Sequence, residues 1–264
     1  MTSEREFYIG YQTRAPAGLS RFLRRAVALL LAFAAALALV LIAIQGRFDP
    51  GVFEFGIVRS FEGVILEEPH PMLLVERPGG DGSAPISRFF LVASGKHGAE
   101  AEVAGFGGQG VRLEGSLIYR EGQTMIEVSS GSVESLGEAD RAPRTDFSEL
   151  GTQTLRGEIV DSKCFFGVMK PGRGKPHRAC ATRCISGGIP PVLRVETRSG
   201  DYQHYLLVDQ DATTVNDRVL ELVAEPVEIT GRVVRRDNLL VLEANPESYR
   251  RIGRVGRPGR VGEK

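Results

Sequence analysis

The stretch RFFLV at residues 88–92 and its counterpart HYLLV at residues 204–208 decide the fold, because they mark a repeat. Each ends in a valine that is followed 23 residues later by a glycine, Gly115 in the first copy and Gly231 in the second. Short apolar alternations separated by glycine are typical of antiparallel β-strands. The equal spacing predicts that the chain contains two copies of one β-structure.

Further matched segments extend the repeat in the same order: 61–66 with 155–160, 73–76 with 193–196, 111–115 with 227–231, and 125–128 with 240–243. Between the third and fourth strands each copy has room for a short helix, at 99–104 and 216–223, and we expect Asn216 to cap the second. Five strands with a helix after the third is the order of an OB-like barrel. We therefore predict a mainly β chain with two tandem OB-like barrels, 52–135 and 152–247, joined by a linker at 136–151. A single larger β-sandwich is the alternative.

A membrane anchor is predicted near the N-terminus. The 19 residues from Ala26 to Ile44 contain no charged or polar side chain, and as a helix they would span about 28 Å, close to the hydrocarbon thickness of a bilayer. Five basic residues precede this run, Arg5, Arg14, Arg21, Arg24 and Arg25, whereas the 15 residues after it contain only Arg47 and Arg59. The positive-inside bias predicts a cytoplasmic segment at 1–25, a span at 26–45 in the bacterial inner membrane, and a periplasmic remainder. A cleaved signal peptide is the alternative, but the run is long for one and the cleavage site is a poor match.

Composition and motifs exclude several functions. The 33 basic and 33 acidic residues balance, and aromatic residues make up only 7% of the chain, so we expect no nucleic-acid partner. No nucleophile elbow, phosphate loop or catalytic carboxylate pair is present, so no catalytic residues are predicted. The histidines His70, His97 and His204 are isolated. His204 opens a strand and is expected to be solvent-exposed; an approach to the loop described below is the alternative. The basic, glycine-rich segment 248–264 is predicted to be disordered.

The two copies differ in the connection between their first and second strands. It spans 12 residues from Gly63 to Val75 and 38 from Gly157 to Val195, so the second copy carries about 26 extra residues, within a loop at 161–191. That connection borders the usual ligand face of an OB-like barrel. All the cysteines of the chain lie in this loop: Cys164, Cys180 and Cys184.

The loop has a helical pattern of metal-ligand residues. Pro176 fits the first position of a helix and Gly187 its C-terminal cap, which predicts a helix of about 11 residues. On it, His177, Cys180 and Cys184 would fall at i, i+3 and i+7, on one face. With Cys164 arriving from the preceding strand, a Cys₃His set is expected to converge.

The loop is also strongly basic. No acidic residue occurs between residues 162 and 195, and nearby cations stabilise a thiolate. The basic residues are Lys163, Lys170, Arg173, Lys175, Arg178, Arg183 and Arg194. The first six are candidates for binding an anionic ligand.

Three interpretations of the cysteines are open. In the first, Cys164 forms a disulfide with Cys180 or Cys184 and pins the loop, leaving one thiol over. In the second, the three cysteines and His177 bind a thiophilic metal, copper or zinc. In the third, Cys180 and Cys184 cycle between dithiol and disulfide.

The strings GEIVDSKC (157–164) and HRACATRCISGGIPP (177–191) resemble a motif of bacterial single-pass envelope proteins that have no assigned activity. Those proteins look like exported OB-like barrels that carry an HxxCxxxC loop, and some share an N-terminus similar to FYIGY (7–11). The resemblance implies the same fold and location for this chain and adds little on mechanism.

These observations predict a membrane-anchored periplasmic accessory or binding protein without turnover of its own. The first barrel would serve as spacer and scaffold, and the second would present the Cys/His loop to an envelope partner such as a membrane-bound redox or metal-dependent enzyme. The alternative is a thiol-dependent oxidoreductase or electron-transfer protein that uses Cys180 and Cys184.

Overall fold

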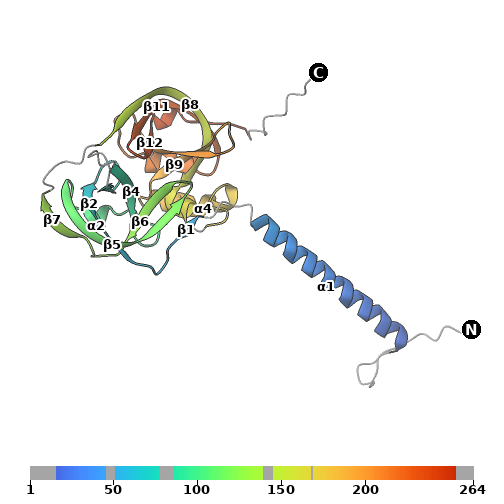
Figure 1. Cartoon of the computed structure of the whole chain (residues 1–264). Helices are drawn as coiled ribbons and strands as arrows, with labels where there is room; N and C mark the ends of the chain where they lie inside the picture. The colour runs from blue at the N-terminus through green and yellow to red at the C-terminus, as the bar shows by residue number, and fades with distance from the viewer. Residues whose placement is uncertain (1–15, 46–50, 78–85, 139–144, 168, 254–264) are drawn as a thin grey trace, which may run out of the picture. The chain divides into compact units, whose positions relative to one another are not determined.

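A computed structural model describes residues 16–45, 51–77, 86–138, 145–167 and 169–253 (Figure 1). The chain divides into two compact units, Met1–Asp49 and Pro50–Lys264. Helix α1 (Ala17–Gln45) belongs to the first unit and every strand to the second. The FYIGY segment and most of the predicted basic tail lie outside the described residues.

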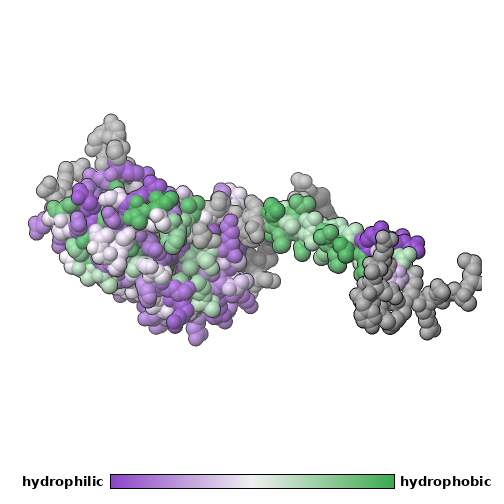
Figure 2. All heavy atoms as spheres, turned by 90° about the horizontal axis from the view of Figure 1, so that it is seen from below, coloured by the Kyte–Doolittle hydropathy of each residue, from purple (hydrophilic) through white to green (hydrophobic). Residues whose placement is uncertain are grey.

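Helix α1 has the length and character of a membrane span. Its 29 residues correspond to about 43 Å, and it is the single helix among the described residues that is long and apolar enough to cross a bilayer. Figure 2 shows apolar side chains along most of its surface and hydrophilic residues at its N-terminal end. The helix begins at Ala17, ahead of the predicted start at residue 26, because the arginines before the apolar run are good helix formers and Pro16 precedes the first turn.

The described part of the first barrel consists of seven strands and one helix: β1 (Val52–Phe53), β2 (Arg59–Leu66), β3 (Met72–Glu76), β4 (Ile86–Val92), α2 (Glu100–Val103), β5 (Gln109–Arg120), β6 (Gln123–Val128) and β7 (Glu134–Glu138). Strand β2 pairs with β3, and β3 with β4. Strand β4 then pairs in parallel with β6, and β5 bonds both β6 and β2 to close the ring. Strands β1 and β7 extend the sheet beside β5.

The second barrel repeats this ring with different connections: β8 (Phe147–Asp161), α3 (Ser162–Phe166), η1 (Lys175–His177), α4 (Arg178–Ser186), β9 (Pro191–Glu196), β10 (Tyr202–Val208), α5 (Asn216–Val219), η2 (Leu220–Leu222), β11 (Pro226–Arg236), β12 (Leu239–Glu243), η3 (Pro246–Ser248) and β13 (Arg250–Arg251). Strands β8, β9, β10, β12 and β11 close in the order of their counterparts, with β10 and β12 parallel. Two closed five-stranded barrels confirm the predicted tandem OB-like architecture and exclude the single sandwich.

Three local expectations differ from the structure. Strand β8 begins at Phe147, inside the segment predicted as linker, because its polar residues pair with β11. Strand β13 lies inside the predicted tail and also pairs with β11. Asn216 does not cap α5; its side chain donates to the carbonyl oxygens of Ile185 and Ile189, where it ties α5 to the cysteine insertion.

The glycines that marked the repeat allow the barrels to close. A Cβ atom on Gly115 would lie 2.5 Å from the carbonyl oxygen of Glu127, and one on Gly231 would lie 2.5 Å from that of Glu243. No real Cβ comes so close to a backbone oxygen, so the strands could not bend past each other here with any other residue. The 23-residue spacing therefore reflects the same barrel corner in both copies.

The barrels share an apolar layer. In β4, Leu91 points into the first barrel's own core, while Phe90 and Val92 point outward. In β10, Leu207 points inward and Leu206 outward. The outward residues of both barrels and of the insertion form one buried cluster, here called the inter-barrel cluster: Met72, Leu74, Ile86, Phe90, Val92, Ile118, Met125, Val160, Phe165, Phe166, Cys184, Ile189, Val192, Leu206, Val208, Val234, Leu239 and Val241.

Two contacts between a basic and an acidic residue lie at equivalent positions of the repeat. Arg88 of β4 donates to Asp237 at 2.7 Å, and both side chains are almost fully buried. His204, which corresponds to Arg88 in the repeat, lies 3.0 Å from Glu121. Each barrel thus contributes one basic strand residue and one acidic turn residue to the contact with the other.

We predict that truncating the inter-barrel cluster destabilises both barrels together. Phe90→Ala should lower the free energy of unfolding by about 3–5 kcal/mol, the usual cost of removing a buried phenylalanine. Urea unfolding of the detergent-solubilised chain, followed by far-ultraviolet circular dichroism, should show one transition at a lower midpoint. Phe147→Ala, at a half-exposed position, should change the free energy by less than about 0.5 kcal/mol. Two separate transitions in the wild-type protein would contradict a shared core.

Candidate functional site

The end of strand β8 places the first cysteine. Asp161 is fully buried, and its carboxylate accepts a hydrogen bond from the backbone N–H of Cys164 at 2.7 Å. This is the bond that an N-cap residue makes. It starts the short helix α3, which ends at Gly167. Cys164 therefore has a fixed position at the mouth of the insertion.

The second and third cysteines come from α4. The predicted helix is present as a 3₁₀ turn, Lys175–His177, followed by the nine-residue α4 and capped by Gly187. The N–H of Gly98, in the first barrel, donates to the carbonyl oxygen of Gly187 at 2.9 Å. A Cβ on Gly187 would lie 2.0 Å from the carbonyl oxygen of Lys96. The insertion therefore packs against the first barrel and is not a free loop.

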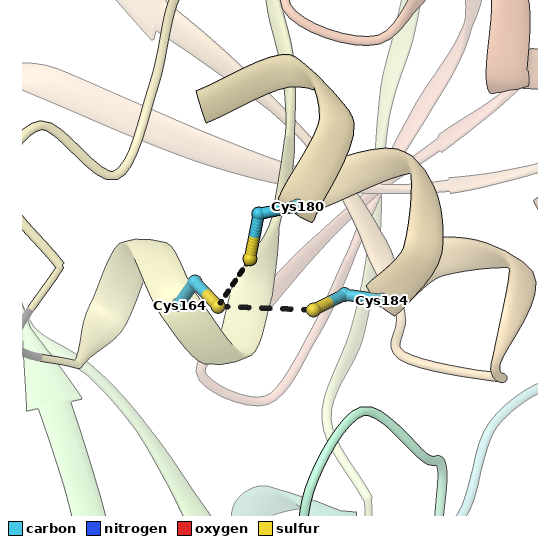
Figure 3. Close-up of side chains that lie close together, drawn as sticks. All are labelled: Cys164, Cys180 and Cys184. Atoms are coloured by element: carbon cyan, nitrogen blue, oxygen red, sulfur yellow. Dashed lines mark hydrogen bonds between the residues drawn. The ribbon is translucent and has the colours of Figure 1, made fainter. Parts of the chain in front are cut away.

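The three thiols converge between α3 and α4 (Figure 3). The sulfur of Cys164 lies 3.9 Å from that of Cys180 and 3.7 Å from that of Cys184, and all three lie within 4.8 Å of one another. These separations exceed a disulfide bond of about 2.05 Å, so all three cysteines are free thiols in this structure. Cys184 is buried, whereas Cys164 and Cys180 are half-buried.

His177 does not join the three thiols as one Cys₃His set. Its Nε2 lies 3.0 Å from the Asp161 carboxylate, and both side chains are buried. With Asp161 and Cys164 it forms a second group of ligand atoms within 4.8 Å of one another. The expected alignment fails because His177 belongs to the 3₁₀ turn and not to α4. The two groups share Cys164.

The cation beside the thiols comes from the first barrel. Lys96, in the connection between β4 and α2, donates to the sulfur of Cys180 at 2.7 Å and lies 3.8 Å from that of Cys184. No sequence pattern indicated this contact, because 84 residues separate Lys96 from Cys180. Asp161 was also missed as a site residue, although an Asp ahead of a short helix is a capping signal.

A hydrogen bond shifts the pKa values of two of the thiols in opposite directions. The hydrogen bond between Cys164 and Cys184 raises the pKa of Cys164 and lowers the pKa of Cys184. Lys96 also lowers the pKa of Cys184 by its charge. The hydrogen bond to Cys180 raises the pKa of Lys96. These shifts favour ionisation of Cys184 over Cys164, with the Cys164 thiol as the donor in their hydrogen bond and Lys96 as the neighbouring cation.

The basic residues of the cysteine loop itself either pair with acidic residues of the barrels or are exposed. Lys163 is buried, pairs with Glu127 of the first barrel, and donates to two carbonyl oxygens there. Arg178 pairs with Glu225 of the second barrel. Both cations are neutralised within the protein, which argues against a role in binding an external anion. The other candidates, Lys170, Arg173, Lys175 and Arg183, are exposed and stay predictions.

The expectation for His204 was wrong. Its side chain is buried, because it packs against the rings of Phe165 and Phe166 in α3 at 5.5 and 5.3 Å between centroids. His204 thus supports the insertion by packing against helix α3. His70 is buried too, and neither of its ring nitrogens has a hydrogen-bond partner among the described residues; burial lowers its pKa to about 4.

The sulfur separations fit ligands of a single metal ion. With bonds of about 2.3 Å, three sulfurs around one metal lie about 3.8 Å apart in tetrahedral and about 4.0 Å apart in trigonal geometry. The two separations from Cys164, 3.7 and 3.9 Å, match these values, and the sulfurs of Cys180 and Cys184 lie within 4.8 Å of each other. Thiolate ligands select soft or borderline ions such as Cu(I) and Zn²⁺. The cluster could therefore bind such a metal with little rearrangement.

No protein-family model and no curated protein matches the chain. Among solved structures it is similar to a deletion mutant of the single-stranded DNA binding protein from Thermus aquaticus, at 16% identity over 80% of this chain and 91% of that chain, with a TM-score of 0.23. So low a TM-score carries no argument, and the barrel assignment is based on the strand pairings. The resemblance to envelope proteins and the expected lack of a nucleic-acid partner stay predictions.

Removing the cation at the thiols should shift their titration. In Lys96→Met the charge that favours the thiolate is lost, so the first thiolate should appear at higher pH than in the wild-type protein. Absorbance of the reduced protein near 240 nm, measured against pH, reports thiolate formation. Lys170→Met removes an exposed lysine of the cysteine insertion and should leave the curve unchanged. Superimposable curves for Lys96→Met and wild type would show that Lys96 does not tune the site.

Buried His70 predicts a loss of stability in mild acid. Its pKa is about 4 in the folded protein and about 6.5 in the unfolded chain, so its stabilisation is complete above pH 6.5 and is lost as pH falls to 4. The loss amounts to at most about 3 kcal/mol. Urea unfolding across this range should show a smaller slope in His70→Leu than in wild type. His97→Leu, at an exposed site, should keep the wild-type slope.

Proposed function

We propose that this protein is a membrane-anchored accessory protein of the bacterial envelope that binds one thiophilic metal ion through Cys164, Cys180 and Cys184. The observation that carries the proposal is the convergence of three free thiols within 4.8 Å of one another, at separations suited to a shared ion. Two helices from one insertion supply them. A disulfide would use two of these sulfurs and leave the third without a role.

Cu(I) is favoured over Zn²⁺. Structural zinc sites use four ligands, whereas the cluster of three cysteines offers three. His177 contacts Asp161 and belongs to the second group of ligand atoms, which shares only Cys164 with the cysteine cluster. Soft Cu(I) is selected by thiolate ligands. Three thiolates with Cu(I) carry a net charge of −2, and Lys96 would offset part of it. Zinc would need a fourth ligand, such as a water molecule.

The metal would enter from the side of Lys96. Lys96 is exposed and Cys180 half-buried, whereas Cys184 lies in the inter-barrel cluster. An incoming ion would displace the hydrogen bond between Lys96 and Cys180, and Cys184 would hold the inner position. The first barrel then contributes to the site itself, in addition to serving as a scaffold.

Chain length limits how far the barrel unit can lie from the membrane that α1 is proposed to span. Gly51 follows the last residue of α1 by six residues, a reach of at most about 22 Å. Its backbone packs against Gly167, the cap of α3, because a Cβ on Gly51 would lie 1.9 Å from the carbonyl oxygen of Gly167. A partner that exchanges metal or electrons with the site would therefore be a membrane-bound enzyme. The N-terminus would be cytoplasmic and the barrels periplasmic.

We expect the reduced full chain in detergent to bind one equivalent of Cu(I) under anaerobic titration against a competing chelator. Cys164→Ser, Cys180→Ser and Cys184→Ser should each weaken binding by more than the about 10–100-fold typical of losing an outer-shell partner. His177→Gln is the matched control and should still bind one equivalent. No uptake by the reduced wild type, with a disulfide and one free thiol in the isolated protein, would refute the proposal in favour of a disulfide scaffold.

A thiol oxidoreductase is the second candidate, favoured by the lowered pKa of Cys184 and by the Lys96 cation. Here Cys180 and Cys184 would give two electrons and two protons to an oxidised partner and form a disulfide. Burial of Cys184 argues against direct attack on a substrate. A reversible two-electron potential in the range of known redox dithiols, unaffected by Cys164→Ser, would support this candidate over metal binding.

A further inference from the structure

An exposed apolar loop connects β1 to β2 in the first barrel. Three of its side chains, Phe55, Ile57 and Val58, are 84%, 52% and 55% exposed. In Figure 1 this loop lies at the lower edge of the barrel unit, and Figure 2, which views the unit from below, shows apolar surface on that face. Adjacent exposed apolar side chains on a soluble surface mark an interaction site.

The loop cannot collapse to hide these side chains. The backbone N–H of Glu54 donates to the carbonyl oxygen of Leu117 at 2.9 Å, and that of Ile57 donates to Glu54 at 3.0 Å. The hydroxyl of Ser116 donates to the carbonyl oxygen of Ile57 at 3.0 Å. Gly56 turns the chain with φ +80°, a conformation that favours glycine. A fixed backbone therefore holds the three apolar groups outward.

The chain places this loop within reach of lipid. The 29 residues of α1 correspond to about 43 Å, the thickness of a bilayer with its headgroups, so the helix would end at headgroup level. Phe55 follows the end of α1 by ten residues, a distance of at most about 36 Å. Arg59, beside the loop, pairs with Glu54 and is half-exposed, so its guanidinium can also meet a lipid phosphate.

We propose that Phe55, Ile57 and Val58 insert into the interfacial layer of the membrane that α1 spans, as a second attachment of the barrel unit. This inference depends on the proposed membrane anchor. Apolar side chains next to a basic residue are the combination that seats a segment in the interface. A single spanning helix does not by itself determine which face of the folded unit meets the membrane. The second contact fixes which face of the barrels is turned to the lipid.

The absence of tryptophan from this chain provides a direct test. Single-tryptophan variants of the full chain are reconstituted in phosphatidylcholine–phosphatidylglycerol vesicles, with and without lipids brominated near the headgroup end of their acyl chains. Phe55→Trp should emit at short wavelength and be quenched by brominated lipid. Phe147→Trp, a half-exposed aromatic position in β8, is the matched control and should be quenched at least about threefold less, because it lies outside the interface.

Leu37→Trp, in the middle of α1, separates the two proposals. Quenching at Leu37→Trp without quenching at Phe55→Trp would overturn the second attachment and leave the anchor in place. No quenching at Leu37→Trp would overturn the membrane anchor and this inference with it. Short-wavelength emission from Phe55→Trp without quenching would also overturn the inference and would show that protein covers the loop: a second copy if the emission depends on protein concentration.

Discussion

The structure depends on the burial of apolar side chains between the two barrels. Strands β4 and β10 are covered on both faces, because each barrel's outer surface is packed against the other. An isolated barrel would expose Phe90, Val92 or Leu206 to water. The hydrophobic effect therefore joins the repeats into one folded unit. The hydrogen-bonded pair Arg88–Asp237 adds a directional contact between the barrels, and His204 lies close to Glu121 at the equivalent position.

The cysteine insertion packs against this interface. Phe165, Phe166 and Cys184 belong to the inter-barrel cluster, and Lys163 reaches into the first barrel to pair with Glu127. Because both ends of the insertion are anchored, its helices hold Cys164, Cys180 and Cys184 close together without a covalent link between them. The same docking brings Lys96 to the thiols. The site is thus composite: the second barrel supplies the sulfurs and the first supplies the cation.

The chemistry of the site follows from its position at the edge of a buried layer. A thiolate at Cys184 would be costly in an apolar environment, and here a hydrogen bond from Cys164 and the charge of Lys96 offset that cost. The same arrangement suits a soft cation, because a bound ion would replace Lys96 as the positive partner of the sulfurs.

The sequence by itself determined the features that depend on local pattern. Alternating apolar residues and the glycines at the barrel corners predicted both OB-like barrels, the uninterrupted apolar run predicted α1, and Pro176 with Gly187 predicted the helix of the insertion. Tertiary structure alone decided which side chains meet. Lys96 and Cys180 are 84 residues apart, His204 is buried by an insertion that follows a different strand, and His177 turned to Asp161 because a 3₁₀ turn replaced the first turn of the helix. Such contacts depend on how the barrels dock, and no local periodicity records that.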